Sequence, residues 1–256
     1  MKTLLVDLKE RVLTITLNRP EVRNAFNDEL IAELTHIFKK DAPDVSVKAV
    51  VLKGAGAAFS AGGDLKWMAK SASYTRKQNR ADAAKLSTLL QAINRLPKPV
   101  IGSVHGAALG GGMGLTAVCD VVVAAEKTLF GFTEVKVGLV PAVISPFVLQ
   151  KIGPSHARAF FLTGERFEAQ RAYEIGLIHR IVPAEQLEPA TDGIVKMILE
   201  GSPKALKKSK VLLEFLTSNN KKNKYNYTSN LLAEMRASPE GKEGIKAFLE
   251  KRKANW

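Results

Sequence analysis

The sequence contains one cysteine, Cys119, among its 256 residues. A single cysteine excludes a disulfide framework within the chain and suits a reducing compartment. The sequence also has no run of about 18 apolar residues, the length that a membrane-spanning helix requires. The apolar stretch after Met1 stops at Asp7, which is too short for the core of a signal peptide. We therefore expect a cytoplasmic protein with no membrane partner.

Acidic residues are scarce relative to basic ones, with 25 Asp and Glu against 38 Lys and Arg, so the net charge is +13. Such a charge attracts nucleic acid or a ligand that carries phosphates. Part of the excess lies near the C-terminus, in Lys204, Lys207, Lys208, Lys210, Lys221, Lys222 and Lys224. The first four alternate with Leu and Val at helical spacing, which is typical of a charged outer helix face. No zinc-ligand spacing accompanies them, so we expect no nucleic-acid partner.

Buried strands and amphipathic helices are predicted to alternate in the first three quarters of the chain. Hydrophobic periodicity and breaker residues predict strands at 2–7, 11–17, 47–52, 100–104, 121–124, 130–132 and 178–182. They predict helices at 27–40 and 76–95, and a third helix that ends at about residue 118. This alternation predicts an α/β core. Only helical patterns remain after about residue 197. We therefore expect a core over 1–196 and a helical region over 197–256 that packs on the core or on another subunit.

Two glycine-rich segments each follow a predicted strand. The first, 58–65, reads AFSAGGDL, and its adjacent glycines let backbone N–H groups approach a ligand without obstruction. The second, 106–115, reads GAALGGGMGL and opens a predicted helix, whose first N–H groups lack partners and attract negative charge. A tight turn and a close helix crossing are the alternatives. Neither segment matches a Walker A loop or a dinucleotide fingerprint.

A third segment places one carboxylate among apolar residues. Residues 130–141 read FGFTEVKVGLVP, with Glu134 near the centre. Apolar surroundings raise the pKa of a carboxyl group, which suits general acid–base catalysis. Taken alone, a single Glu is more often a surface residue.

Together these segments resemble the enoyl-CoA hydratase/isomerase (crotonase) family. Two further segments support the resemblance, NRPEVRNAF at 18–26 and EGIKAFLEKRKANW at 243–256, and the order and spacing match along the whole chain. The resemblance implies an α/β fold, a spiral of ββα units with an α-helical C-terminal region. It also implies a homotrimer or a dimer of trimers. RNA binding or scaffolding on the same fold stays a remote alternative, supported by charge alone.

The resemblance implies specific roles for residues of this chain. The backbone N–H groups of Gly63 and Gly111 would form an oxyanion hole, and Glu134 would transfer a proton. The positions that match contacts to the adenine, pantetheine and nucleotide end of coenzyme A (CoA) are Arg23, Ala25, Ala61, Asp64, Leu65, Lys66, Phe248 and Lys251. We expect no metal and no permanently bound cofactor, because CoA would enter as part of an acyl-CoA substrate.

One position departs from the pattern of the family. Its hydratases commonly carry two glutamates that flank a water; Glu134 matches one, and the other falls at Gly114. A single Glu can move one proton, as in the isomerases of the family. Hydration would then need its water positioned by a backbone group or by a carboxylate on the substrate. His105 precedes the second glycine segment, and we expect a structural role for it.

The longer segments FSAGGDLKWM, GLVPAVISPFVLQKIG and FFLTGERFEAQRAYEIGLIHRIV resemble the bacterial methylglutaconyl-CoA and isohexenylglutaconyl-CoA hydratase branch. That branch lacks the same glutamate and acts on branched 2-enoyl thioesters with a distal carboxylate. The resemblance therefore predicts a carbon–oxygen lyase that hydrates a thioester such as 3-methylglutaconyl-CoA, in leucine or fatty-acid breakdown. The alternative in the same class is an isomerase that moves a 3-enoyl double bond to the 2-position.

Overall fold

The computed structural model describes residues 1–217 and 223–256, so Lys221 and Lys222 lie outside the described residues. The strands are β1 (Leu4–Lys9), β2 (Val12–Leu17), β3 (Ala49–Gly54), β4 (Val100–Val104), β5 (Ala107–Leu109), β6 (Val121–Ala125), β7 (Leu129–Gly131), β8 (Arg166–Glu168) and β9 (Arg180–Val182). The helices are α1 (Asp28–Lys40), α2 (Leu65–Ala72), α3 (Arg76–Asn94), α4 (Gly111–Val118), α5 (Ser145–Thr163), α6 (Ala169–Glu174), α7 (Leu187–Glu200), α8 (Pro203–Thr217), α9 (Lys224–Ala237) and α10 (Pro239–Leu249). Short 3-10 helices are η1 (Pro20–Val22), η2 (Thr133–Val137) and η3 (Ala184–Gln186).

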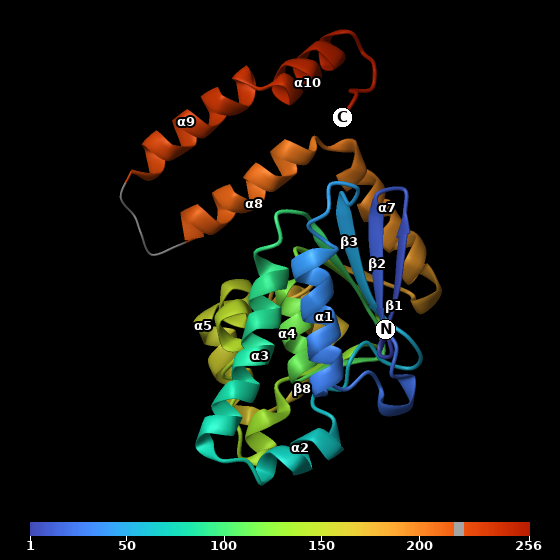
Figure 1. The fold of residues 1–256 in the computed structure, drawn as a ribbon, viewed down its shortest axis with the longest axis vertical. Coiled ribbons are helices and arrows are strands. Elements are labelled where there is room, and N and C mark those ends of the chain that lie inside the picture. Colours follow the sequence, from blue (N-terminus) through green and yellow to red (C-terminus); the bar gives the residue numbers. More distant parts are fainter. Residues whose placement is uncertain (218–222) are drawn as a thin grey trace.

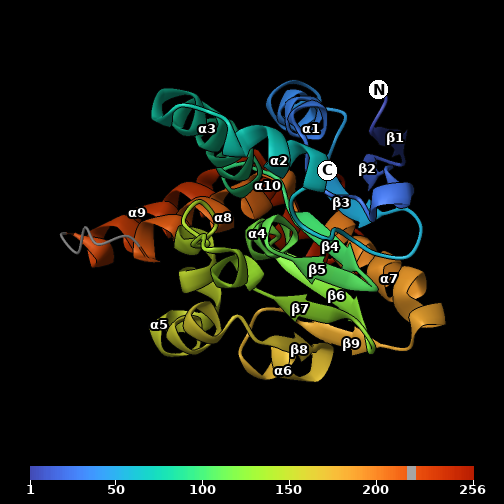
Figure 2. The same ribbon diagram turned by 90° about the horizontal axis from the view of Figure 1, so that it is seen from below.

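The larger sheet has the strand order β1-β2-β3-β4-β6-β9, and its strands from β2 onward pair in parallel. Parallel strands covered on both faces are rich in Val, Ile and Leu, as β3 and β6 are. Successive side chains point to opposite faces. Val50 and Leu52 join the core that contains α1, α3 and α4, whereas Val51 packs with residues of α7. Figure 2 shows the sheet between these helices.

A smaller sheet of order β5-β7-β8 lies beside the larger one. Isolated parallel bridges, Ser60 with Ala108 and Phe26 with Gly63, extend it toward the N-terminal part of the chain. Each successive unit therefore sends one strand to the larger sheet and the next to the smaller one before its helix begins, as in β4-β5-α4 and β6-β7-α5. This repeat confirms the predicted α/β spiral of ββα units.

The C-terminal helices α8, α9 and α10 lie at one end of the molecule, and α2 lies at the opposite end (Figure 1). The predicted boundary between residues 196 and 197 falls inside α7. Ile194 and Val195 of α7 are buried against Val51 and Val123 of the larger sheet. α7 thus packs on the core, and the boundary between core and helical region stays a prediction.

Three lysines of α8, Lys204, Lys208 and Lys210, form ion pairs within the chain. Lys208 lies 3.0 Å from Glu234 of α9, and Lys210 lies 2.7 Å from Asp120. Part of the basic cluster therefore attaches α8 to its neighbours. Elsewhere, burial raises the pKa of the Cys119 thiol to about 12, which keeps it protonated and unreactive at neutral pH. No helix in the described ranges is both long and apolar enough to span a membrane.

Candidate active site

Three segments that are far apart in the sequence meet at one edge of the smaller sheet. Gly63 follows the bridge residue Ser60, Gly111 follows β5, and Glu134 follows β7. Ser60 pairs in parallel with Ala108 of β5, and β5 pairs in parallel with β7. Since parallel strands have their carboxyl ends at the same edge of a sheet, the two glycines and the carboxylate are brought together.

The Gly63 N–H group is directed away from the neighbouring backbone. Phe26 N donates to Gly62 O at 2.6 Å, and Asp64 N donates to Phe26 O at 2.9 Å. In a parallel bridge these two bonds use the groups on either side of Gly63 and leave its own N–H on the opposite side. Within the described chain this N–H has no acceptor. It is therefore free to bind a ligand.

The Gly111 N–H group likewise has no acceptor among the residues that the structure describes. Gly111 is the first residue of α4, and the residue before it, Gly110, provides no side-chain cap. The first N–H groups of a helix lack intrahelical partners and lie at the positive end of its dipole. Gly110 has φ +47° and ψ −114°, which turns the chain sharply into the helix. The second glycine segment therefore presents an N–H donor beside β5.

The carboxyl group of Glu134 lies next to both glycine segments. A methyl group placed on Gly110 would lie 3.5 Å from Oε1 of Glu134 and 3.8 Å from Cα of Gly62. Oε2 of Glu134 is buried and has no hydrogen-bond partner among the described residues. Burial raises the pKa of Glu134 above its ordinary value. A half-buried acid with one buried, unpaired oxygen beside two N–H donors is the arrangement expected of an acid–base site.

A second unpaired polar atom lies close by, the indole Nε1 of Trp67 in α2. Cε3 of the same ring would be 3.9 Å from a methyl group on Gly63. Buried polar atoms without partners are rare in folded proteins. The unpaired Oε2 of Glu134, whose carboxyl group lies beside Gly110, marks this edge of the sheet as a place where a ligand supplies the missing contact.

The enoyl-CoA hydratase/isomerase family model matches residues 7–256. The chain belongs to this family. It is 36% identical to the 2,3-dehydroadipyl-CoA hydratase of Escherichia coli strain K12, covering 98% of this chain and 97% of that protein. It is 31% identical to a trans-2-decenoyl-[acyl-carrier-protein] isomerase of Streptococcus mutans, covering 100% of this chain and 98% of that protein. A solved enoyl-CoA hydratase of Shewanella pealeana superposes with a TM-score of 0.95 at 38% identity, covering 99% of this chain and 96% of that one.

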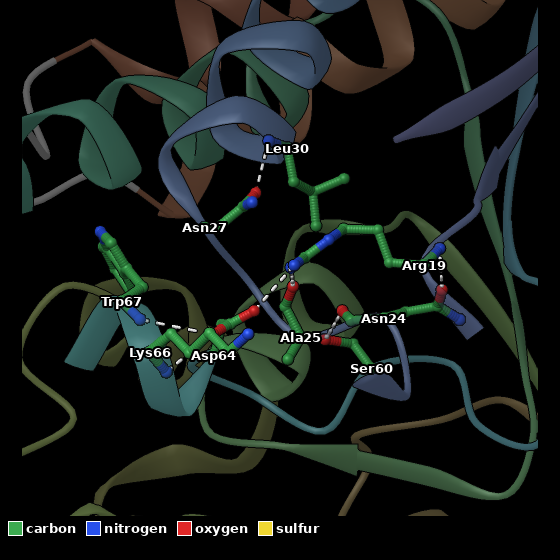
Figure 3. Close-up of polar contacts among 9 residues, drawn as sticks. All are labelled: Arg19, Asn24, Ala25, Asn27, Leu30, Ser60, Asp64, Lys66 and Trp67. Atoms are coloured by element: carbon green, nitrogen blue, oxygen red, sulfur yellow. Dashed lines mark hydrogen bonds and ion pairs between the residues drawn. The ribbon is translucent and has the colours of Figure 1, made fainter. Parts of the chain in front are cut away.

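In this crotonase-family chain, most of the residues predicted to bind CoA lie together. They belong to two adjacent segments, 18–27 and 59–66, which are joined by a hydrogen bond from Ala61 N to Arg23 O at 2.9 Å. Figure 3 shows Ala25, Asp64 and Lys66 in this region. The side chains of Leu65 and Lys66 are exposed, so a large ligand can reach them. The CoA roles of Arg23, Ala25, Ala61, Leu65 and Lys66 stay predictions.

The carboxylate of Asp64 is bound inside the chain. One oxygen caps α2 by accepting from Lys66 N at 2.8 Å and Trp67 N at 3.3 Å, and the other lies 2.7 Å from Nη2 of Arg19 (Figure 3). Burial alone would raise the pKa of Asp64, but the hydrogen bonds from Arg19 and the cap lower it overall. Any CoA contact of Asp64 stays a prediction. Arg19 itself was not among the predicted site residues, although the NRP motif contains it.

The C-terminal pair does not lie at this site within the same chain. Phe248 is in α10 and Lys251 follows it, at the end of the molecule opposite α2 (Figure 1). Phe248 is 83% exposed. The CoA contacts of Phe248 and Lys251 stay predictions.

His105 contacts the backbone rather than the acid–base site. Its Nε2 lies 2.9 Å from the carbonyl oxygen of Gly56, in the turn that follows β3. This contact ties the turn before the first glycine segment to the end of β4. The geometry fits the structural role that we expected for His105.

The space beside Gly114 is filled by apolar side chains. A methyl group at Gly114 would lie 2.5 Å from Cγ2 of Ile144 and 3.3 Å from Cδ1 of Leu90. Both neighbours are buried. A second carboxylate at this position would therefore need Ile144 to move.

We expect Gly114→Ala to lower the free energy of unfolding by about 1–3 kcal/mol, the usual result of overpacking a core. Urea unfolding followed by circular dichroism measures this difference. Gly193→Ala in α7 is the matched control, because nothing lies within 4 Å of the added methyl group. The control should be neutral or stabilising by about 0.5–1 kcal/mol, the difference between Gly and Ala in a helix. Equal stabilities for the two variants would contradict the packing at Gly114.

Proposed function

We propose that the protein hydrates a 2-enoyl-CoA thioester whose acyl group carries a distal carboxylate, such as 3-methylglutaconyl-CoA. The observation that supports hydration or isomerisation at this site is the position of the Glu134 carboxyl group beside the two glycine segments that hold free N–H donors. The thioester oxygen would accept from Gly63 and Gly111. Developing charge on that oxygen is then stabilised, and one such donor is typically worth about 2.7–4 kcal/mol.

Water would add in two proton-transfer steps with one carboxylate. The polarised thioester withdraws electrons from the C2–C3 double bond, so the water oxygen bonds to C3 while Glu134 takes one water proton. The resulting enolate then takes a proton from Glu134 at C2, which restores the carboxylate. The sum is addition of one water across the double bond. The raised pKa of Glu134 suits a group that must both accept and return a proton.

Three observations favour an acyl group with a distal carboxylate. The chain resembles the glutaconyl-CoA branch in its longer segments. The Escherichia coli relative is named for a thioester of a dicarboxylic acid. The place of a second glutamate is filled by Ile144 and Leu90, so a carboxylate that helps to hold the water must come from the substrate.

The second candidate is an isomerase at the same site. It is favoured by the single glutamate and by the name of the Streptococcus mutans relative. Glu134 would remove a proton from C2 of a 3-enoyl thioester and return it to C4. No water is needed, so the absence of a second carboxylate near Gly114 would be no obstacle.

Ultraviolet absorbance of the conjugated enoyl thioester distinguishes these functions. Purified protein is mixed separately with crotonyl-CoA, 3-methylglutaconyl-CoA and a 3-enoyl-CoA. Fast loss of absorbance with 3-methylglutaconyl-CoA alone supports the proposal. Loss with crotonyl-CoA alone keeps hydration and rejects the distal carboxylate. A gain of absorbance with the 3-enoyl-CoA, and no loss with the other two, establishes the isomerase instead.

We also propose that the C-terminal helical region, 197–256, joins subunits into trimers and brings Phe248 and Lys251 to a neighbouring site. Support comes from the exposure of Phe248 and from the position of its helix, α10, at the end of the molecule opposite α2 (Figure 1). A cytoplasmic location and a role in leucine or fatty-acid breakdown also stay proposals. The proposed assembly does not depend on them.

Mixed oligomers test that arrangement. We expect a variant with both Phe248→Ala and Lys251→Ala to have a raised KM, and Glu134→Gln to be inactive. Co-refolded mixtures of the two should have more activity at low substrate concentration than the sum of the separate proteins. A site with intact Glu134 then receives an intact C-terminal pair from its neighbour. Strictly additive activity would show that the pair does not serve a neighbouring site.

A further inference from the structure

The backbone of Gly63 is held in place by the segment that precedes α1. Phe26 bonds to the residues on both sides of Gly63, through Gly62 O at 2.6 Å and Asp64 N at 2.9 Å. Phe26 belongs to the segment 18–27, whose own shape is fixed by a bond from Arg19 N to Asn24 Oδ1 at 2.8 Å. The direction of the Gly63 N–H therefore depends on how the segment 18–27 sits against the glycine segment.

Arg19 cross-links these two segments. Its guanidinium donates to the carbonyl of Ala25 at 2.5 Å and to Oδ2 of Asp64 at 2.7 Å (Figure 3). The two side chains are 15% and 8% exposed. A largely buried pair of this kind depends on both partners, because removal of one leaves the other charge without compensation.

The same carboxylate sets the start of α2. Oδ1 of Asp64 accepts from the backbone N–H groups of Lys66 and Trp67. The next side chains of α2 lie over Gly63, since a methyl group there would be 3.1 Å from Sδ of Met68 and 3.9 Å from Cε3 of Trp67. Asp64 thus connects Arg19, the Gly63 backbone and the wall of the site that α2 forms.

We propose that Arg19, through its ion pair with Asp64, is a positioning residue that keeps the Gly63 N–H directed at the thioester oxygen. This inference rests on the proposed function, because it assumes that Gly63 binds that oxygen. Arg19 touches no reacting atom. A misplacement of about 1 Å at a catalytic group can lower a rate about 10²-fold, so we expect Arg19→Gln to lower kcat about 10-fold to 10²-fold while KM changes little.

The test measures carbonyl polarisation directly. Butyryl-CoA labelled with ¹³C at the thioester carbonyl is saturated and cannot be hydrated, and its ¹³C resonance should move downfield on binding to the wild-type protein. We expect a smaller shift with Arg19→Gln and an intermediate one with Arg19→Lys, which keeps the charge but loses the planar fork. Arg171→Gln is the matched control, because Arg171 forms an exposed pair with Glu174 on α6. Its shift should equal that of the wild type.

A double-mutant cycle separates positioning from CoA binding. If the pair acts as a unit, Arg19→Gln combined with Asp64→Asn should lower kcat no further than either change alone. The inference would be overturned if the double variant lost kcat by the product of the two single-variant factors. So would a raised KM with unchanged kcat in Asp64→Asn, which would make Asp64 a direct CoA contact.

Two outcomes of the ¹³C experiment distinguish this inference from the proposed function. If the wild type binds butyryl-CoA without any downfield shift, the oxyanion site itself is rejected. If the wild type and Arg19→Gln show equal shifts and equal kcat, only the positioning role is rejected. Arg19→Lys provides the same comparison should Arg19→Gln fail to fold.

Discussion

Glu134→Gln should lower kcat about 10²-fold or more, the usual contribution of a positioned general acid–base group. The glutamine keeps the size of the side chain but cannot exchange a proton. Steady-state kinetics with the thioester that the wild type turns over gives the ratio. Glu188→Gln is the control, because Glu188 pairs with Lys53 on the surface with 77% of its side chain exposed. Full activity in Glu134→Gln would reject Glu134 as the acid–base group.

Although Glu134→Gln should lower kcat, we expect it not to lower the free energy of unfolding. Since burial raises the pKa of Glu134 in the folded state, the folded protein holds this proton more tightly than the unfolded chain. Its contribution to stability is therefore largest below the unfolded pKa, about 4.3 for a free Glu, and is lost as pH rises through the folded pKa. At neutral pH Glu134→Gln should be at least as stable as the wild type in urea unfolding. A large loss of stability would indicate a structural role instead.

Gly110→Ala should lower kcat about 10²-fold to 10³-fold, the effect of losing one oxyanion donor. Gly110 has φ +47° with ψ −114°, a conformation that residues with a Cβ rarely adopt. Relief of that strain must rotate the peptide between Gly110 and Gly111, and this turns the Gly111 N–H away from the thioester oxygen. The added methyl group would also lie 3.5 Å from Oε1 of Glu134.

Gly63→Ala is the matched comparison for this prediction. Alanine keeps the backbone N–H, and its methyl group would meet mainly the flexible end of Met68, at 3.1 Å from Sδ. We therefore expect a change in kcat of less than about tenfold, or 1.4 kcal/mol in activation free energy. The ¹³C shift of bound butyryl-CoA should be nearly unchanged in Gly63→Ala and clearly smaller in Gly110→Ala, where only the Gly63 N–H still donates. Similar rates for the two variants would contradict the geometry at Gly110.

Long periodic elements could be predicted from the sequence because their signals are local. Asn27 caps α1 by accepting from Leu30 N, and the helix covers Asp28–Lys40 where 27–40 was predicted. The buried strand at 100–104 was also predicted with its observed bounds. Both elements bury regularly spaced apolar residues, so hydrophobic periodicity was sufficient for them.

Short elements of the smaller sheet could not be predicted in this way. β5 and β8 have three residues each, and neither was among the predicted strands. α2 was missed because none of its residues is fully buried, and its cap, Asp64, follows a glycine pair. These elements exist because of pairing and packing with distant segments, which leaves little local pattern in the sequence.

In the candidate site too, some features could be predicted from the sequence and others could not. Gly63, Gly111 and Glu134 were identified by family resemblance, and the structure brings their segments together. Their convergence depends on the pairing of Ser60 with Ala108 and of β5 with β7, which no periodicity indicates. The bond between Arg19 and Asp64 joins residues 45 positions apart. Only the folded backbone places that guanidinium beside the cap of α2.

Proton exchange at C2 tests the central claim, that Glu134 acts on a thioester held by two backbone N–H groups, for hydratase and isomerase alike. Butyryl-CoA and glutaryl-CoA are incubated with the protein in D₂O, and deuterium at C2 is measured by mass spectrometry. We predict that the wild type exchanges the C2 hydrogens of at least one thioester, and that Glu134→Gln slows this exchange about 10²-fold or more. Equal exchange by the wild type and Glu134→Gln, or none by the wild type with either thioester bound, would contradict the account.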